Sequence, residues 1–406
     1  MNHSSRLTPN IQSSFFLPVF LCCMVYTASY LGRYSYSANI TPIIDAFGAS
    51  RADAGLITSF FFFSYGIGQI LNGILCKYYP KRLIISASLI VSSILNLAIY
   101  AGIPFSLYKY LWLINGICLS ILWPSLVLLL SETMSKENLT KSALVMSLPV
   151  PIGTFIIYGA SSLFVNAGHY ENAFLLAAIT MLAATAVWII FYPKAFSSTK
   201  SIQQVAKNET TGTKFSPALL GTILILAFFA VGCNLVKDGL GTWVPAILKE
   251  NFALPDSLSI LLTLLLPVVS FFSAALDAYM HKKIPSFVKL CALWYILAFV
   301  LIGLVILTIN AGPWILVLAL FGLIALFAHG INTLITSMAP LHMRDQINSG
   351  LLTGILNGCC YMGSAISSYG LGSVADKAGW SGVFWLLFAV CGVNVVLTLF
   401  TKKIKN

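Results

Sequence analysis

The sequence predicts an all-α membrane protein with twelve spanning helices in two six-helix halves. Hydrophobic residues make up 58% of the 406 residues and charged residues only 9%, whereas roughly a quarter of a typical soluble chain is charged. The apolar runs are about 20 residues long, the length at which a helix crosses a hydrocarbon core about 30 Å thick. Alternation of apolar and polar residues over half that length, typical of a membrane β-barrel, does not occur in the sequence.

The predicted spans follow one another with short loops between them. They cover residues 14–40, 54–76, 83–102, 109–131, 142–165, 171–193, 216–248, 257–280, 286–309, 313–339, 347–373 and 380–401. The long polar connection between the sixth and seventh spans divides the chain into nearly equal parts. We therefore predict an N-terminal six-helix bundle over residues 1–195, a cytoplasmic linker over 196–214 and a C-terminal six-helix bundle over 215–406.

Lys and Arg are distributed unequally between the two ends of the spans. With both termini in the cytoplasm, seventeen of them lie on the cytoplasmic side, and only Arg51, Lys109, Lys249 and Lys377 lie outside. This is the positive-inside pattern, and it predicts a multi-pass protein of the cell membrane. The net charge of +11 therefore belongs to loops rather than to a basic stripe, so we expect no nucleic-acid partner.

Several chemistries have no motif in this sequence. The nine cysteines lie almost entirely inside apolar runs without a CxxC metal spacing, so we expect packing residues and neither disulfides nor a metal site. A G-x-x-x-x-G-K-[ST] loop for ATP is absent, as are an HExxH motif and a Ser/His/Asp constellation. We therefore predict no enzyme activity and no cofactor.

Two cations inside spans are the strongest functional signal. Arg33 in the first span is followed nine residues later by Pro42, and Lys237 in the seventh is followed eight residues later by Pro245. Matching residues at matching depth are typical of transporters whose site lies between two repeats. A cation within a span costs about 2.5–3.5 kcal/mol on insertion scales, which favours a side chain turned toward a cavity. The alternative is that both cations extend to the outer interface.

The neighbours of these cations support a cavity that binds an anion. Tyr26, Tyr30, Arg33 and Ser37 form a polar stripe at helical spacing. Two facing cations require an anion, and the planar fork of Arg suits a carboxylate or phosphate.

Asp238 and His329 leave alternatives open. Asp238 could neutralise Lys237 or take up a proton, although successive helical side chains diverge by about 100°; an ion pair with another residue is an equal alternative. His329 shares a helix face with Asn332 and Thr336. It could add a donor or couple transport to protons, or it could simply form an interhelical hydrogen bond.

Other features suit either a transport path or helix packing. Helix 5 contains Pro149 and Pro151, so we expect a kink that frees carbonyl groups near the cavity. Glycine runs at 66–68 and 358–363 suggest close-packing surfaces. Polar faces lie on the second and eleventh spans: Tyr65, Gln69, Asn72, Asn357, Tyr361, Ser364 and Ser368.

Taken together, several segments resemble the organophosphate:phosphate antiporter family of major facilitator transporters. These are Tyr30-Leu31-Gly32-Arg33, Ser64-Tyr65-Gly66-Ile67-Gly68-Gln69, Trp123-Pro124, Lys237-Asp238-Gly239, Trp243-Val244-Pro245 and Asp376 with Gly379-Trp380. In that family an Arg in helix 1 and another in helix 7 bind phosphate, so the resemblance implies this role for Arg33 and Lys237, with Tyr30 and Tyr361 at its aromatic positions.

The sequence departs from the family at three places. Gln69 occupies the position of a helix 2 Lys, prolines replace a helix 5 His, and Lys77 stands where a loop Asp is usual. Fewer cationic donors imply a substrate less charged than a phosphate dianion, such as a carboxylate or a phosphodiester.

We therefore predict a secondary active transporter that moves a small organic anion, an organophosphate or a carboxylate, by alternating access. It would work as a monomer in the lipid bilayer, with exchange for phosphate and proton symport both open. The predicted substrate-binding residues are Arg33, Lys237, Tyr30, Tyr361, Asn234 and Gln69, and the predicted proton-coupling residues are His329 and Asp238. The alternatives are a transporter-like sensor of organophosphates and an efflux pump for amphipathic drugs.

Overall fold

The computed structural model describes residues 15–196, 217–343, 346–347 and 349–399, and these residues form helices and no strands. The first half contains α1 (Phe16–Ala38), α2 (Ile40–Phe47), α3 (Arg51–Leu75), α4 (Lys81–Tyr100), α5 (Tyr108–Ser120), α6 (Leu122–Thr133), α7 (Lys136–Val145), α8 (Pro149–Asn166) and α9 (Asn172–Ala195). The second half contains α10 (Pro217–Phe252), α11 (Asp256–Leu262), α12 (Leu265–Ser270), α13 (Ser273–Lys283), α14 (Phe287–Thr308), α15 (Trp314–Thr333), α16 (Ala339–His342) and α17 (Ser349–Leu399).

The described helices account for twelve crossings. Eleven stretches are long and apolar enough to span a membrane, and the last of them covers Gly350–Thr398. Within it, Gly379 has φ 64° and ψ −176°, so α17 consists of two helices joined at this residue. The left-handed φ suits a residue without a Cβ. The predicted all-α fold with twelve spans is confirmed.

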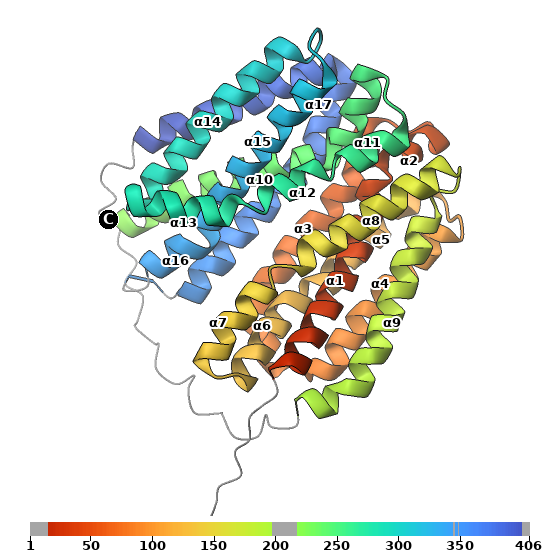
Figure 1. The fold of residues 1–406 in the computed structure, drawn as a ribbon, viewed down its shortest axis with the longest axis vertical. Coiled ribbons are helices and arrows are strands. Elements are labelled where there is room, and N and C mark those ends of the chain that lie inside the picture. The colour runs from red at the N-terminus through yellow and green to blue at the C-terminus, as the bar shows by residue number, and fades with distance from the viewer. Residues whose placement is uncertain (1–14, 197–216, 344–345, 348, 400–406) are drawn as a thin grey trace, which may run out of the picture.

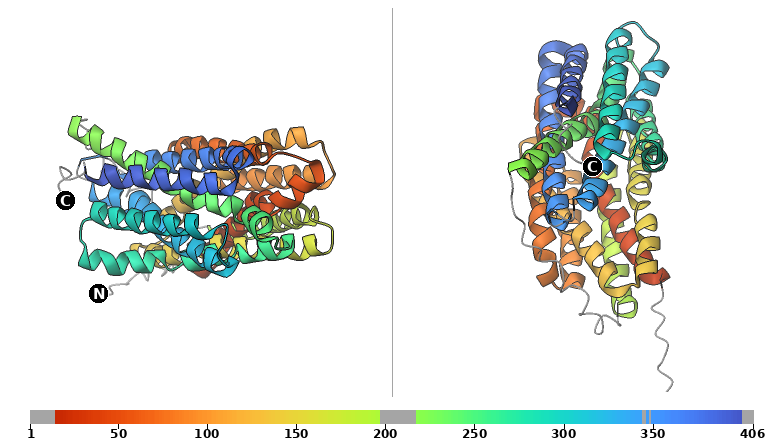
Figure 2. Two further views of the ribbon diagram at one scale, coloured as in Figure 1. Left: turned by 90° about the horizontal axis from the view of Figure 1, so that it is seen from above. Right: turned by 90° about the vertical axis from the view of Figure 1, so that its left-hand side faces the viewer.

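The two halves lie side by side, with the N-terminal half in red to yellow-green and the C-terminal half in green to blue (Figure 1). Two further views show the helices of both halves running in roughly the same direction (Figure 2). Between the halves, α3 packs along α17 and α8 packs on α11. The predicted linker, 196–214, lies outside the described residues apart from Phe196.

The predicted glycine packing surfaces are confirmed. A Cβ added at Gly66 would lie 2.7 Å from the Cβ of Tyr361, and one added at Gly358 would lie 2.4 Å from Ile70. Both contacts join α3 to α17. Glycine therefore allows the two halves to approach more closely here than any larger residue would.

Among the described residues, three spans are interrupted where the sequence predicts one continuous or kinked helix. In span 4, α5 ends at Ser120 and α6 begins at Leu122. In span 5, α7 ends at Val145 and α8 begins at Pro149, because proline cannot donate the hydrogen bond of a helix interior but fits the first helical turn. The predicted kink is therefore a break. In span 8, the helix is divided into α11, α12 and α13.

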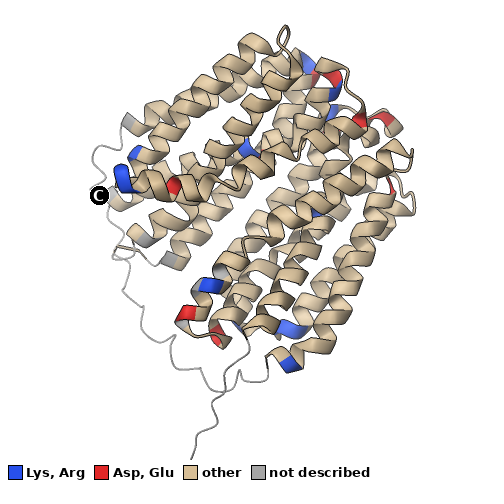
Figure 3. Cartoon of the chain, viewed as in Figure 1, with Lys and Arg blue, Asp and Glu red and all other residues tan. Residues whose placement is uncertain are grey.

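Charged residues gather toward the ends of the helices, and few lie within the bundles (Figure 3). Six of the nine cysteines are buried and three are half-buried, as packing residues would be.

Candidate substrate-binding site

A cavity of about 280 Å³ lies between the two halves, near the middle of the spans. Its wall is formed by α1, α8 and Phe62 of α3 from the N-terminal half, and by α10, α15, Tyr361 of α17 and the α11–α12 region from the C-terminal half. Arg33, Lys237, Asp238 and His329 all line it. The structure therefore brings both predicted cations to one cavity.

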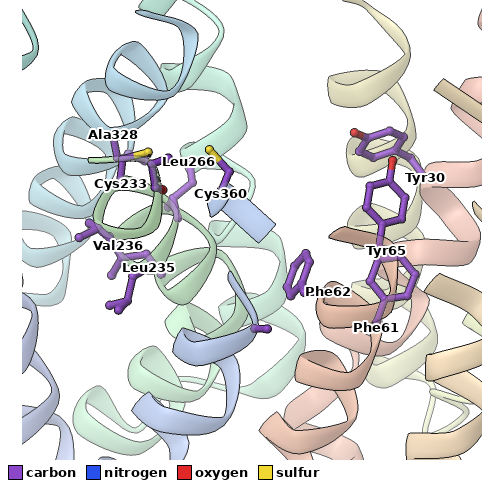
Figure 4. Close-up of a cluster of buried hydrophobic side chains, with 14 of the residues drawn as sticks. Tyr30, Phe61, Phe62, Tyr65, Cys233, Leu235, Val236, Leu266, Ala328 and Cys360 are labelled. Atoms are coloured by element: carbon purple, nitrogen blue, oxygen red, sulfur yellow. Dashed lines mark hydrogen bonds between the residues drawn. The ribbon is translucent and has the colours of Figure 1, made fainter. Parts of the chain in front are cut away.

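Arg33 is surrounded by aromatic rings. Its Cζ lies 4.9–5.5 Å from six ring centroids. These six rings, which we call the aromatic cage, belong to Tyr30, Tyr34, Phe61, Phe62, Tyr65 and Tyr361. Figure 4 shows Tyr30, Phe61 and Tyr65 close together on the N-terminal half, with Phe62 between them and the C-terminal half.

The guanidinium of Arg33 has no counter-ion in the part of the chain that the structure describes. Arg33 is 7% exposed, and its Nε is buried without a hydrogen-bond partner. None of the ion pairs between described residues includes it. A ring face attracts a desolvated cation by about 2 kcal/mol or more, but it accepts no N–H as a carboxylate oxygen does. The site is therefore suited to an anion supplied from outside the chain.

Lys237 has a partner. Its Nζ lies 3.2 Å from Oδ1 of Asp238, so of the alternatives for Asp238 the structure shows an ion pair with Lys237. The other carboxylate oxygen, Oδ2, accepts hydrogen bonds from Asn234 Nδ2 at 3.2 Å and from the hydroxyl of Ser364. Asn234 in turn accepts from Asn332 Nδ2 at 2.8 Å. Asn234 does not line the cavity; it lies behind Asp238 and fixes its position.

His329 lines the cavity, and its Nδ1 lies 2.9 Å from the carbonyl oxygen of Ala325. This bond lies within α15, and no interhelical hydrogen bond of His329 is found among the described residues, although the sequence leaves that alternative open. A carbonyl only accepts, so Nδ1 carries the proton and a neutral ring has an acceptor at Nε2. Among the described residues Nε2 has no hydrogen-bond partner, and it is not a fully buried atom.

The remaining predicted residues divide between the cavity and helix packing. Tyr30 and Tyr361 line the cavity. Gln69 does not, because its Nε2 donates to the carbonyl oxygen of Ser120 at 3.1 Å. Asn72 donates to the hydroxyl of the same serine at 2.9 Å. Gln69 and Asn72 therefore hold α3 against α5, and the structure places Gln69 outside the predicted substrate site.

The sequence reading missed several residues of the cavity. Tyr34 and Phe62 belong to both the aromatic cage and the cavity wall. Tyr158 lines the cavity, and its hydroxyl donates to the carbonyl oxygen of Gly241 in the other half at 3.3 Å. Tyr34 could have been found from its place next to Arg33 and four residues after Tyr30. The Phe side chains offered no such signal, because a run of phenylalanines in an apolar span is equally suited to face lipid.

One end of the molecule is held together by ionic contacts between the halves. We call these residues the Arg51 cluster: Asp45, Arg51, Lys249, Glu250, Asp256 and Asp376. Arg51 binds Glu250 with Nε and Nη2 at 3.0 and 2.5 Å, and its Nη1 lies 3.1 Å from Asp376. Lys249 pairs with Asp45 across the halves and with Asp256 at 2.8 Å.

Asp376 also caps a helix of the opposite half. Its two carboxylate oxygens accept hydrogen bonds from the backbone N–H groups of Arg51 at 3.2 Å and Ala52 at 2.9 Å, in the first turn of α3. These donors have no acceptor within their own helix, and a carboxylate at the N-terminus also complements the helix dipole. Every hydrogen bond or ion pair that joins described residues of different halves lies between this end and the cavity.

The chain is similar to known membrane transport proteins over most of its length. The Major Facilitator Superfamily profile matches residues 22–349. The chain is 21% identical to a "Probable hexose phosphate transport protein" of Chlamydia pneumoniae over 402 residues, covering 92% of this chain and 88% of that protein. It is 22% identical to "Sugar phosphate exchanger 3" of Bos taurus over 409 residues, covering 86% and 80%.

A solved structure has the same fold. It is a bacterial homologue of the human lysosomal transporter Spinster, in an inward-facing and occupied conformation, with TM-score 0.69, 14% identity and coverage of 94% of this chain and 95% of that one. The family resemblance found in the sequence is confirmed, and the fold is that of a transporter rather than an enzyme. The matched profile, the twelve spans and the cavity between two halves lead to one conclusion: this chain belongs to the major facilitator superfamily.

Proposed function

We propose that this protein is a secondary active transporter for a small organic anion, with Arg33 as the principal anion ligand. The observation that carries the proposal is a guanidinium that lines a cavity between the halves, inside an aromatic cage, without an acidic partner among the described residues. Leaving a cation so placed is costly unless a ligand compensates it. Anion binding supplies that compensation.

The other cavity residues would orient the substrate. Tyr30 and Tyr361 offer hydroxyl groups on opposite halves, Lys237 offers a second cationic donor, and His329 offers an acceptor for a substrate hydroxyl. In this proposal Asn234 and Asp238 position Lys237, and Gln69 has no contact with substrate.

The halves would rock about this site. With both termini in the cytoplasm, as the distribution of Lys and Arg favours, the Arg51 cluster lies on the outer side of the cell membrane and this conformation is closed to the outside. Opening outward would require the halves to separate at the cluster and to close at the opposite end.

Movement of the organic anion would be coupled to a second solute in one of two ways, by exchange for phosphate or by symport with a proton. The proteins similar to this chain include ones named as a hexose phosphate transport protein and a sugar phosphate exchanger, which supports exchange and a phosphate-linked substrate. Proton symport would use His329, whose Nε2 is available to the cavity. Neither route needs more than a monomer.

The test is transport by purified protein in proteoliposomes loaded with inorganic phosphate, with external hexose phosphates and small carboxylates as substrates. Wild type should show uptake, and Arg33→Gln should lose it while keeping a similar melting temperature. Arg82→Gln is the matched control, since Arg82 lies at the end of α4, where its Nη2 donates to the carbonyl oxygen of Ile189 far from the cavity. It should transport like wild type.

Three other results would contradict the proposal. Uptake that survives Arg33→Gln would mean that Arg33 is not the anion ligand. Binding that depends on Arg33 without any flux favours a sensor. Flux of lipophilic cations but of no anion favours a drug efflux pump.

A further inference from the structure

The net charge of the cavity is the sum of the charges of the residues that line it. The titratable and charged groups that face it are Tyr30, Arg33 and Tyr34 on α1, Tyr158 on α8, Lys237 and Asp238 on α10, His329 on α15 and Tyr361 on α17. Tyr is uncharged at neutral pH at its ordinary pKa of about 10, and His is largely uncharged at pH 7.5. Two cations and one carboxylate remain, which leaves one net positive charge.

Asp238 is held as a carboxylate by its neighbours. Lys237 Nζ, Asn234 Nδ2 and the Ser364 hydroxyl converge on its two oxygens, and Asn332 orients the amide of Asn234 by donating to its oxygen. An ionised carboxylate only accepts hydrogen bonds, so all three of these donors favour the ionised form. Asp238 therefore cancels Lys237 as a binding charge, although the sequence places the two cations in equivalent positions.

We infer that the cavity selects singly charged anions and that Asp238 is the residue that sets this selectivity. The inference rests on the proposed function and adds the charge class of the substrate. One unpaired guanidinium compensates one negative charge. A dianion would leave a second charge without a partner in a cavity between the halves that holds no further unpaired cation among the described residues, where electrostatic interactions are weakly screened.

The first experiment needs no variant. Binding of two matched pairs is measured on the full-length wild type by calorimetry: methyl phosphate against dimethyl phosphate, and malate against lactate. Dimethyl phosphate and lactate are monoanions at both pH 5.5 and pH 7.5. Methyl phosphate, with a second pKa of about 6, is mostly a monoanion at pH 5.5 and mostly a dianion at pH 7.5.

The expected result is that methyl phosphate binds roughly 25-fold more weakly at pH 7.5 than at pH 5.5, in proportion to its monoanion fraction. Dimethyl phosphate should keep its affinity, and any change it does show reports titration of the protein, including His329. Lactate should bind more tightly than malate at pH 7.5.

The second experiment changes the charge of the cavity. Asp238→Asn keeps the side-chain size and an acceptor but raises the net charge by one. At pH 7.5 the preference for methyl over dimethyl phosphate, and for malate over lactate, should rise by at least about tenfold. Asp277→Asn is the matched control: Asp277 is also a buried carboxylate within a span, but it accepts from Trp294 Nε1 at 2.8 Å and does not line the cavity. It should leave both preferences unchanged.

The outcomes separate the two proposals. Wild type that binds the dianion of either pair at least as tightly as the monoanion at pH 7.5 overturns the inference while leaving anion transport intact. So does an Asp238→Asn protein that binds with wild-type preference. If Asp238→Asn does not fold, the binding of the two anion pairs to wild type decides whether the cavity selects monoanions. No binding of any of the four anions would overturn the proposed function itself.

Discussion

Replacing Gly55 with alanine should open the end of the molecule that carries the Arg51 cluster. A Cβ at Gly55 would lie 2.1 Å from the carbonyl oxygen of Ser368 in the other half, whereas ordinary contacts begin near 3.4 Å. The halves must therefore separate there by about 1 Å or more. The hydrogen bond of 2.9 Å from Ala52 N–H to Asp376 would then exceed the length of a hydrogen bond.

The added methyl group destabilises the closed state because it overpacks the contact between the halves. Forcing an extra methyl group into a close-packed contact costs about 1–3 kcal/mol. Each 1.4 kcal/mol is a factor of ten in an equilibrium constant. Since the clash exists only while this end is closed, the population open at this end should rise roughly 5- to 150-fold.

Amide hydrogen exchange measures this opening directly. The N–H groups of Arg51 and Ala52 find their acceptor in Asp376 of the opposite half, so they exchange when the halves part. Exchange in a peptide covering these residues should accelerate by the same factor in Gly55→Ala. Gly73→Ala is the matched control, because Gly73 lies on the same helix and its Cβ would meet nothing within 4 Å.

Two results would contradict opening between the halves. One is a Gly55→Ala protein whose α3 terminus exchanges at the wild-type rate. The other is equal acceleration in α14, far from the contact, which would indicate general unfolding rather than opening between the halves.

Three further predictions concern other contacts. Trp380→Phe keeps a ring but removes an N–H that donates to Glu250 at 2.8 Å within the C-terminal half. Because that bond orients the carboxylate that Arg51 binds across the halves, its loss should weaken the closed end by about 1 kcal/mol, visible as faster exchange at the same amides. Gly153→Ala places a Cβ 2.6 Å from that of Tyr30, so it should displace this cavity tyrosine and weaken anion binding, measured by calorimetry. Asp277→Leu should lower the free energy of unfolding by about 1–3 kcal/mol, because the indole N–H that it accepts becomes buried and unpaired, whereas Asp277→Asn should melt near wild type.

The sequence predicts the spans well because their length and apolarity are set by the membrane rather than by neighbouring helices. The break before Pro149 was predicted only as a kink. A proline shows that the helix is disturbed, but neighbouring helices decide whether a few residues leave helical geometry. The separation of α11, α12 and α13 has no comparable signal at each joint.

The site could be predicted only in part. The paired positions of Arg33 and Lys237 point to one cavity, but they suggest two equivalent cations. Their difference depends on contacts from distant segments: Ser364 of α17 fixes Asp238, while Phe61 and Phe62 of α3 surround Arg33. Gln69 is predicted to bind substrate, but it binds Ser120 of α5 instead. The sequence shows that a helix has a polar face, but it does not show whether that face meets a cavity or a neighbouring helix.

The aromatic cage is divided unequally between the halves. Five of its six rings come from α1 and α3, the helices of the same half as Arg33, and Tyr361 alone comes from the other. When the halves rock, most of the rings that stabilise the Arg33 guanidinium therefore travel with it. The cage would stabilise this cation nearly equally in both states, and an interaction of equal strength in both states favours neither. A preference of the empty carrier for one face of the membrane would thus come from contacts outside the cage, such as the ion pairs of the Arg51 cluster.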